Sequence, residues 1–442
     1  MTQRSIWSYQ DNFDFRQDIG PGSPFHFPLE RHRGEYSRQK MLNAYHLDAE
    51  GNLRPGATAQ SAEAVLFGGH IGCGKSTELR DYAELFKRTY TVRHLELTKT
   101  LDINNLRFSD LLIALTAALV ETFADSAGGM TPHAIFVDPV LNWFDVRIVK
   151  QERFRDIDGE IKTEAKVAGG IPLLASLLAT MTAKLRGGAS YREELRREMR
   201  DGFLQLLLHF NALIAHANDL LAKQGQGPLL FIVDGADKLS KEDSHTFFSA
   251  DVNQLGQIQA NLIVCAPISV LLEAGVTGQR FTRVQLPMLK IFDADETPRR
   301  RAEDALIELV YRRMPKEFFD APETVRYLVR HSGGHVRDLL RLGRACFSRL
   351  DGESITGEIA ELAVRDVAAE YQRLVRREDW ADLALIDRSY GEEKDRSENR
   401  LRLLYDLVLL EYNNYWWRSH PLVRTLPAYK KALNALPPPP VA

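Results

Sequence analysis

Hydrophobic positions in the first two thirds of the chain follow two patterns that alternate along the sequence. Short, almost continuous apolar runs occur at residues 64–67, 91–97, 229–234, 261–266 and 282–286. Between these runs, apolar residues recur at the spacing of one helix face. Continuous apolar runs are typical of parallel strands that are covered on both faces. The alternation therefore predicts an α/β fold, with a mostly parallel sheet and helices packed against both of its faces.

A different pattern begins near residue 297, where the strand-like runs end and helical spacing takes over. The exception is residues 407–418, in which apolar and aromatic residues flank Asn413 and Asn414. Asn tolerates the positive φ of a tight turn, so this segment predicts a β-hairpin. The region at about 125–190 has mixed signals, including a strand-like run at 134–137, and we interpret it as an insertion.

A glycine-rich turn connects the first apolar run to a helical pattern over residues 78–87. The turn matches the pattern G-x-x-x-x-G-K-[ST], which requires this strand–turn–helix context. Its nine residues are Gly69, His70, Ile71, Gly72, Cys73, Gly74, Lys75, Ser76 and Thr77. Successive N–H groups of such a turn point at a phosphate, and the helix N-terminus adds its positive dipole. Because Lys75 can reach the outer phosphates and the Ser76 hydroxyl can bind Mg²⁺, the sequence predicts nucleotide binding.

Acidic residues stand at the end of the run at 229–234. Ligands of open α/β sheets bind at the carboxyl ends of the strands, so we expect Asp234 to hold Mg²⁺. The next residue is Gly235, where many ATPases carry a glutamate, and this predicts slow hydrolysis. Asp237 could orient the attacking water or could cap the following turn. Ser269, just past the run at 261–266, is a candidate sensor of the γ-phosphate.

Three arginines are candidates for contacts with phosphate. A second glycine-rich turn, at residues 332–335, places Arg337 early in a helix. There it could reach the terminal phosphates and couple a helical lid to the nucleotide, or it could face solvent. Arg280 and Arg283, at the start of the last strand-like run, could serve a neighbouring subunit's nucleotide or lie on the surface. The expected catalytic residues are Lys75, Asp234, Asp237, Arg337 and Arg280.

The motifs at residues 69–77, 234–237 and 333–337 together resemble the AAA+ superfamily of P-loop ATPases, above all its origin-recognition-like and its STAND or KAP-like branches. The resemblance covers about residues 60–350 discontinuously. It implies ATP and Mg²⁺ as cofactors, a parallel-sheet core, a helical lid and a C-terminal winged helix. The expected organisation is an extended N-terminal arm (1–34), the ATPase core (35–290, with the insertion), the lid (291–355) and a winged-helix-like domain (356–442).

Composition limits the function classes. The net charge of -3 argues against a protein that coats nucleic acid, while 44% hydrophobic and 26% charged residues are ordinary for a globular protein. Cys73, Cys265 and Cys346 lack metal spacing and fit a reducing compartment, so we expect a cytoplasmic protein. Cys73 is either a small filler or an oxidation-sensitive switch. His331 and His335 lie around the second glycine turn without evident partners. The apolar stretch at 167–185 is too weakly hydrophobic to predict a membrane span.

The resemblance favours one function and leaves two alternatives. The first is an ATP-binding, ATP-hydrolysing switch that forms homo-oligomers and acts on a protein effector, as in bacterial phage-defence complexes. The second is a DNA-acting AAA+ ATPase, such as a loader or transposition regulator, that uses its winged helix. The basic and aromatic residues for that role are Trp416, Trp417, Arg418, Arg424, Lys430 and Lys431. The third is a scaffold that holds ATP without hydrolysing it.

Overall fold

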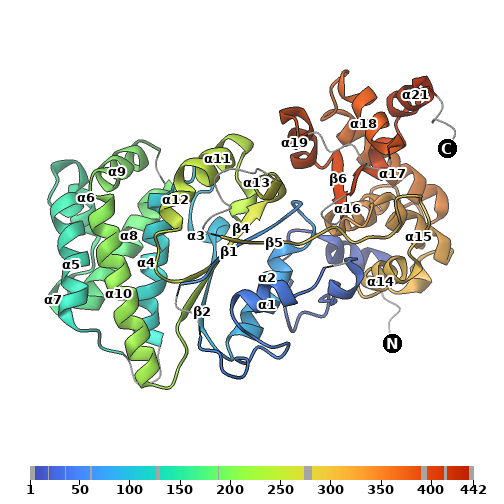
Figure 1. Ribbon diagram of the computed structural model, residues 1–442. Coiled ribbons are helices and arrows are strands. Elements are labelled where there is room, and N and C mark those ends of the chain that lie inside the picture. The colour runs from blue at the N-terminus through green and yellow to red at the C-terminus, as the bar shows by residue number, and fades with distance from the viewer. Residues whose placement is uncertain are drawn as a thin grey trace.

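The chain folds around a parallel β-sheet. The computed structural model describes residues 5–17, 19–34, 36–59, 62–125, 130–187, 189–272, 281–389, 396–412 and 416–437 (Figure 1). Its larger sheet has the strand order β2-β3-β4-β1-β5, and all four pairings are parallel. The strands are β1 (Ala64–Gly69), β2 (Thr91–Glu96), β3 (Leu229–Asp234), β4 (Asn261–Pro267) and β5 (Thr282–Gln285). The expected α/β fold with a parallel sheet is confirmed.

Both faces of this sheet are covered, which explains the continuous apolar runs. Alternate residues of one strand point to opposite faces. Leu66 packs into a core with helices α4 (Phe108–Asp125) and α10 (Phe203–Lys223). Its neighbour Val65 packs into a second core, with α1 (Gln39–Ala44) and α2 (Lys75–Phe86). The strands therefore bury both sets of side chains, as expected for a sheet between two helical layers.

The insertion is helical throughout its described part. It contains α5 (Ala134–Phe144), α6 (Arg155–Glu160), α7 (Thr163–Ala168), α8 (Gly170–Gly187) and α9 (Ala189–Asp201). The strand expected at 134–137 is wrong. His133 caps this segment as a helix by accepting a hydrogen bond from the Ile135 N–H, and Val137, Val140 and Phe144 are buried at helical spacing. A short apolar run cannot by itself distinguish a strand from a buried helix, and here the packing against α10 decides.

Helices dominate the chain from residue 300 onward, and this part lies at the opposite end of the sheet from the insertion (Figure 1). They are α14 (Arg300–Tyr311), α15 (Pro322–His331), α16 (Val336–Phe347), α17 (Gly357–Gln372), α18 (Asp379–Arg388), α19 (Glu398–Tyr405), α20 (Pro421–Arg424) and α21 (Pro427–Ala435). Side chains from α14 to α21 form one hydrophobic cluster. Among the described helices, none has the length and the apolar character that crossing a bilayer requires.

The predicted hairpin near the C-terminus is present. Strands β6 (Leu409–Tyr412) and β7 (Trp416–Ser419) pair antiparallel, while the Asn413 and Asn414 turn lies outside the described residues. The order α17, α18, α19 and hairpin is the one expected for a winged helix. However, every residue of β6 and β7 is buried, because the hairpin packs between the sheet core and the lid.

The N-terminal arm connects the lid to the sheet core. Its 3₁₀ helix η1 (Ile6–Phe13) inserts Ile6 and Phe13 into the cluster formed by the lid helices. Phe13 lies against Gly343 of α16, where an added Cβ would come within 2.4 Å of the ring. The arm then runs past the turn that follows β1 and reaches α1. It is therefore an integral part of the packing and not a loose extension.

The glycine turn before α16 generates a prediction about stability. Gly334 has φ of 80° and an added Cβ would lie 2.0 Å from the Leu289 carbonyl oxygen. We expect Gly334→Ala to lower the free energy of unfolding by about 3 kcal/mol or more, because it combines left-handed strain with a backbone clash. Gly56 has a similar φ of 79° with no atom within 4 Å, so Gly56→Ala isolates the strain, at about 1 kcal/mol. Denaturant titration measures both, and equal losses would contradict the close approach.

Candidate nucleotide-binding site

The turn between β1 and α2 has the backbone shape that its sequence predicts. Gly72 and Gly74 have φ of 87° and 106°, a region that L side chains rarely adopt. Helix α2 begins at Lys75, and the Glu78 N–H bonds to the Gly74 carbonyl. The N–H groups of the first helical residues therefore have no partner within α2 and stand at the mouth of the turn. Such a cluster of donors at a helix N-terminus is suited to binding an anion.

Lys75 is buried inside this turn. Its Nζ donates to the carbonyls of Gly69 at 2.8 Å and His70 at 2.7 Å, and lies 2.8 Å from Asp237 Oδ2. Burial disfavours the charged forms of both Lys75 and Asp237, but the attraction between the two ions is larger than this cost. The pKa of Lys75 is therefore raised and the pKa of Asp237 is lowered. Ser240, not Asp237, caps the following helix α11 (Lys241–His245). The sequence left two roles open for Asp237, orienting a water molecule or capping the following turn. Its contact with Lys75 favours the role at the predicted phosphate site.

Ser76 and Asp234 meet at the carboxyl end of β3. The Ser76 hydroxyl donates to Asp234 Oδ1 at 3.0 Å, and the Asp234 carboxylate is buried. A hydroxyl and carboxylate oxygens are hard ligands, and Mg²⁺ prefers such ligands together with phosphate and water. Asp237 Oδ1 is buried nearby and has no hydrogen-bond partner among the described residues. Burial, followed by the Asp237 carboxylate, keeps the pKa of the neighbouring Cys265 thiol well above its usual range, so this thiol stays protonated. The oxygen atoms of Ser76, Asp234 and Asp237 are therefore suitable ligands for a hard divalent cation.

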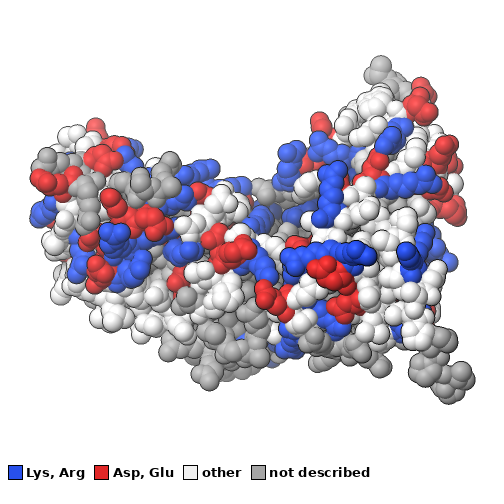
Figure 2. All heavy atoms as spheres, turned by 90° about the horizontal axis from the view of Figure 1, so that it is seen from above, with Lys and Arg blue, Asp and Glu red and all other residues white. Residues whose placement is uncertain are grey.

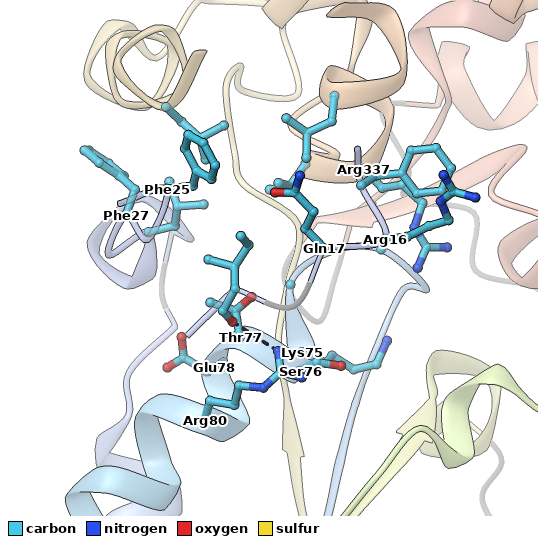
Figure 3. Close-up of a pocket in the computed structure, with 18 of the residues that line it drawn as sticks. Arg16, Gln17, Phe25, Phe27, Lys75, Ser76, Thr77, Glu78, Arg80 and Arg337 are labelled. Atoms are coloured by element: carbon cyan, nitrogen blue, oxygen red, sulfur yellow. Dashed lines mark hydrogen bonds between the residues drawn. The ribbon is translucent and has the colours of Figure 1, made fainter. Parts of the chain in front are cut away.

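A cavity of about 440 Å³ opens beside the turn. Lys75, Ser76 and Thr77 line its lower part, and Figure 3 places Phe25 and Phe27 on one side of it and Arg337 and Arg16 on the other. The apolar lining consists of Phe15, Ile19, Phe25, Phe27 and Leu29 from the arm and Leu309, Val336 and Leu340 from the lid helices. A lining that combines basic side chains with aromatic and aliphatic ones suits a ligand that joins phosphates to a flat ring.

The N-terminal arm is the part of this site that sequence reasoning missed. Arg33 is buried, and its guanidinium donates to the carbonyls of Cys73 at 2.7 Å and Pro287 at 2.6 Å. This clamps the arm onto the glycine-rich turn and brings Phe25 and Phe27 to the cavity. The proline- and aromatic-rich composition of 21–28 was the available signal, but it did not indicate which surface the arm would cover.

The lid contacts the glycine-rich turn directly. The Arg337 N–H donates to the Gly72 carbonyl at 3.3 Å, and the Arg337 side chain lines the cavity. An added Cβ at Gly72 would lie 2.9 Å from Arg337 Nε. His335 Nε2 lies 2.7 Å from the carbonyl of Ile71. Arg337 is thus half-buried against the predicted phosphate site and does not lie on a solvated helix face.

His335 has partners that the sequence did not reveal. Its Nδ1 lies 2.8 Å from Asp338 Oδ2, so both ring nitrogens face oxygen acceptors. Asp338 also accepts from the Tyr371 hydroxyl and from Arg341 Nη1, each at 2.6 Å. His420 Nε2 lies 3.1 Å from the same Oδ2. This buried group, which we call the Asp338 cluster, joins the lid and the segment after the hairpin to the glycine-rich turn.

The hairpin makes its own contact with the turn. His70 Nε2 accepts a hydrogen bond from the backbone N–H of Glu411 at 2.8 Å. Burial, together with the nearby His335 ring and the Lys75 ammonium, keeps the pKa of His70 well below its usual range. Tyr412 donates to the Gly333 carbonyl at 2.6 Å and so fixes the hairpin on the second glycine turn. The two glycine turns and the hairpin form one continuous contact.

The remaining expected residues divide into three groups. Arg280 lies outside the described residues. Arg283 Nη1 donates to the Leu271 carbonyl at 3.2 Å, and Ser269, on α13 (Ile268–Leu272), is not among the residues that line the cavity. Cys73 is fully buried, with Sγ 3.9 Å from the Leu286 carbonyl, which fits the small filler.

The basic and aromatic residues near the hairpin do not form the exposed surface that DNA contact would require. Trp416, Trp417 and Arg418 are buried, and Arg418 and Arg424 both pair with Glu296. The exposed members are the two lysines of α21, Lys430 and Lys431. On the face shown in Figure 2, Lys and Arg are interspersed with Asp and Glu. The hairpin residues chosen for DNA contact instead pack against the core, for example Trp416 against Phe292.

Comparisons with known proteins give only distant likenesses. No family model matches the sequence, and no curated protein matches it. The ORC2 protein of Aeropyrum pernix, solved as ADPNP and ADP complexes, is similar with a TM-score of 0.40 and 13% identity over 96% of both chains. Cdc6p from Pyrobaculum aerophilum is similar with a TM-score of 0.33 and 13% identity, over 92% of this chain and 98% of that one. The fold assignment therefore rests on the sheet and the glycine-rich turn of this chain.

The buried, neutral His70 predicts a loss of stability in mild acid. Its pKa is depressed in the folded state, so below about pH 6.5 the unfolded chain takes up a proton that the folded chain does not. Each such histidine costs up to about 1.4 kcal/mol per pH unit. His420, whose pKa burial also lowers, adds to the effect. We expect His70→Gln, which keeps an acceptor for Glu411, to flatten the dependence between about pH 7 and pH 5. Denaturant titrations measure it, and identical slopes for variant and wild type would contradict the burial of a neutral ring.

Proposed function

We propose that this protein is an ATP-binding, slowly hydrolysing molecular switch of the AAA+/STAND type that works as a homo-oligomer on a protein effector. The observation that carries the proposal is the direct contact of the lid and the hairpin with the glycine-rich turn, through His335, Arg337 and Glu411. A triphosphate held by that turn would act on both elements at once. The effector, and a place in a phage-defence complex, rest on the resemblance alone.

The roles follow from where the side chains lie. Residues Gly69 to Thr77 cradle the phosphates with their N–H groups, and Lys75 donates to the outer phosphate oxygens. Ser76 and Asp234 would hold Mg²⁺, which supplies charge neutralisation on the phosphate oxygens. Arg337 completes the phosphate contacts from the lid side. Arg280 remains a candidate for an arginine supplied to a neighbouring subunit.

Asp237 has two successive tasks in this scheme. Without nucleotide it neutralises Lys75 and keeps the lysine within the turn. When phosphate oxygens take over Lys75, the Asp237 carboxylate becomes available to orient a water molecule and accept its proton. A single carboxylate without a neighbouring glutamate fits slow turnover. The non-hydrolysing scaffold differs from this scheme by turnover alone.

The first test concerns nucleotide binding and assembly. We expect Lys75→Ala to abolish ATP binding, because it removes the buried ammonium at the phosphate site. We expect Arg337→Ala to weaken ATP binding roughly tenfold, in line with the loss of a charge-assisted contact, and to prevent ATP-dependent assembly. Calorimetry measures the affinity, and light scattering measures the mass with and without ATP and Mg²⁺.

Two surface variants serve as controls for this test. Lys87→Ala removes an exposed lysine at the end of the same helix α2, and Arg349→Ala removes an exposed arginine that pairs with Asp366. Both are expected to bind ATP and assemble as the wild type does. Unchanged affinity and unchanged mass in Lys75→Ala and Arg337→Ala would sink the proposal.

The second test uses the pairing of Asp237 with Lys75. Asp237→Asn removes the internal competitor for the ammonium, so we expect ATP affinity to rise about three- to tenfold while phosphate release falls at least about tenfold. The free variant should also unfold more easily, by about 3 kcal/mol, because Lys75 is left buried without its counter-ion. Saturating ATP should restore that loss. An Asp237→Asn variant that hydrolyses ATP at the wild-type rate would remove Asp237 from the mechanism.

A further inference from the structure

A buried arginine borders the apolar part of the cavity. Arg313 follows α14, is 4% exposed and is one of the residues that line the cavity beside Phe25. Its Nη1 donates to the Leu309 carbonyl at 3.0 Å, and its Nε is buried without a partner among the described residues. The guanidinium carbon lies 5.2 Å from the centre of the Phe25 ring. One edge of the guanidinium, Nε and Nη2, is therefore left without an acceptor in the described part of the chain.

Two of the other buried arginines pair with carboxylates, while Arg33 and Arg418, like Arg313, each have a buried Nε without a hydrogen-bond partner among the described residues. Arg33 donates to two carbonyls, Arg196 pairs with Asp110, and Arg400 pairs with Asp382. In the described residues, Arg313 has neither a carboxylate nor a second carbonyl. Burial, together with the cation of Arg312, lowers its pKa to about 10, so it remains charged at neutral pH. A buried charge without a partner is costly, and the cavity is the place from which a partner can come.

We propose that Arg313 is the base-reading residue of the cavity and donates to the N7 edge of a purine. The inference rests on the proposed function, since the glycine-rich turn must hold the phosphates of the same ligand. N7 is an acceptor in both adenine and guanine, and guanine adds O6 on the same edge. The Nε–Nη2 edge presents parallel donors, and the Phe25 ring offers an apolar face for the base. The ligand class is a purine nucleoside triphosphate.

The test separates the base from the phosphates. Calorimetry compares ATP, 7-deaza-ATP and tripolyphosphate for the wild type and for Arg313→Met, which keeps an apolar stem. We expect the wild type to bind ATP roughly tenfold or more tightly than 7-deaza-ATP, the effect of one charge-assisted hydrogen bond. Arg313→Met should bind both nucleotides equally and weakly, with unchanged affinity for tripolyphosphate. Arg301→Met, at an exposed arginine of the preceding helix α14, should behave as the wild type does.

Three outcomes would count against the proposal. Equal binding of ATP and 7-deaza-ATP by the wild type, or a 7-deaza effect that persists in Arg313→Met, would overturn base reading while leaving the proposed function in place. Failure of the wild type to bind ATP or tripolyphosphate would overturn both.

Thermal unfolding of the free protein provides an independent readout. A purely structural arginine stabilises the fold, whereas removing a charge kept for a ligand does not destabilise it. We therefore expect Arg313→Met to melt at or above the wild-type temperature, and a clearly lower melting temperature would contradict the inference.

Discussion

The backbone of the glycine-rich turn has two sides, and the rest of the molecule depends on this constraint. Its N–H groups stand at the N-terminus of α2, where the proposed nucleotide would bind, while its carbonyls at Ile71 and Gly72 accept from His335 and the Arg337 N–H. A peptide plane is rigid, so an N–H cannot turn without moving the neighbouring carbonyl. Any change in the turn that phosphate requires is therefore transmitted to the first residues of α16.

The Asp338 cluster connects the first residues of α16 to the rest of the helical part. Asp338 is fully buried, and its pKa lies well below its usual range because its interactions with His335 and His420 outweigh the cost of burial. A buried network of this kind is favourable when every member is paired and costly when one partner is lost. Loss of any one partner of Asp338 would therefore destabilise the whole cluster. Tyr371 and His420 belong to the cluster, so a change in the cluster would also change the packing between α16, α17 and the segment after the hairpin.

The sequence predicted the parts of the structure whose physical cause is local. Continuous apolar runs identified the strands, the glycine pattern identified the turn before α2, and the acid that ends β3 lies beside Ser76 as expected. The segment at 134–137 was misassigned because four apolar residues fit a strand and a buried helix equally well. Trp416 and Trp417 do not form the expected contact surface. Large aromatic residues contribute most to stability when they are buried, as both are here.

The parts that could not be predicted depend on contacts between segments far apart in the chain. His335 meets a carbonyl 264 residues away, and His70 meets an N–H 341 residues away, and neither pairing leaves a signal in the local sequence. In the sequence, Arg313 is one of two adjacent arginines just after α14, and only the fold shows that it is buried beside Phe25. Such residues are informative because burying a polar or charged side chain costs free energy that the rest of the fold must offset.

The same long-range contacts determine the direction in which a switch can work. Lys75 is neutralised by Asp237, and the turn is held by His335 and by the backbone N–H of Glu411. Phosphate would have to displace Asp237 from Lys75, and the affinity for phosphate would therefore include the cost of that exchange. Linkage is reciprocal: a partner that draws the hairpin away from His70 must change the affinity of the turn for phosphate by the same factor by which phosphate changes the affinity for the partner. Under the proposed function, the hairpin would act as a regulatory element through its contact with the turn.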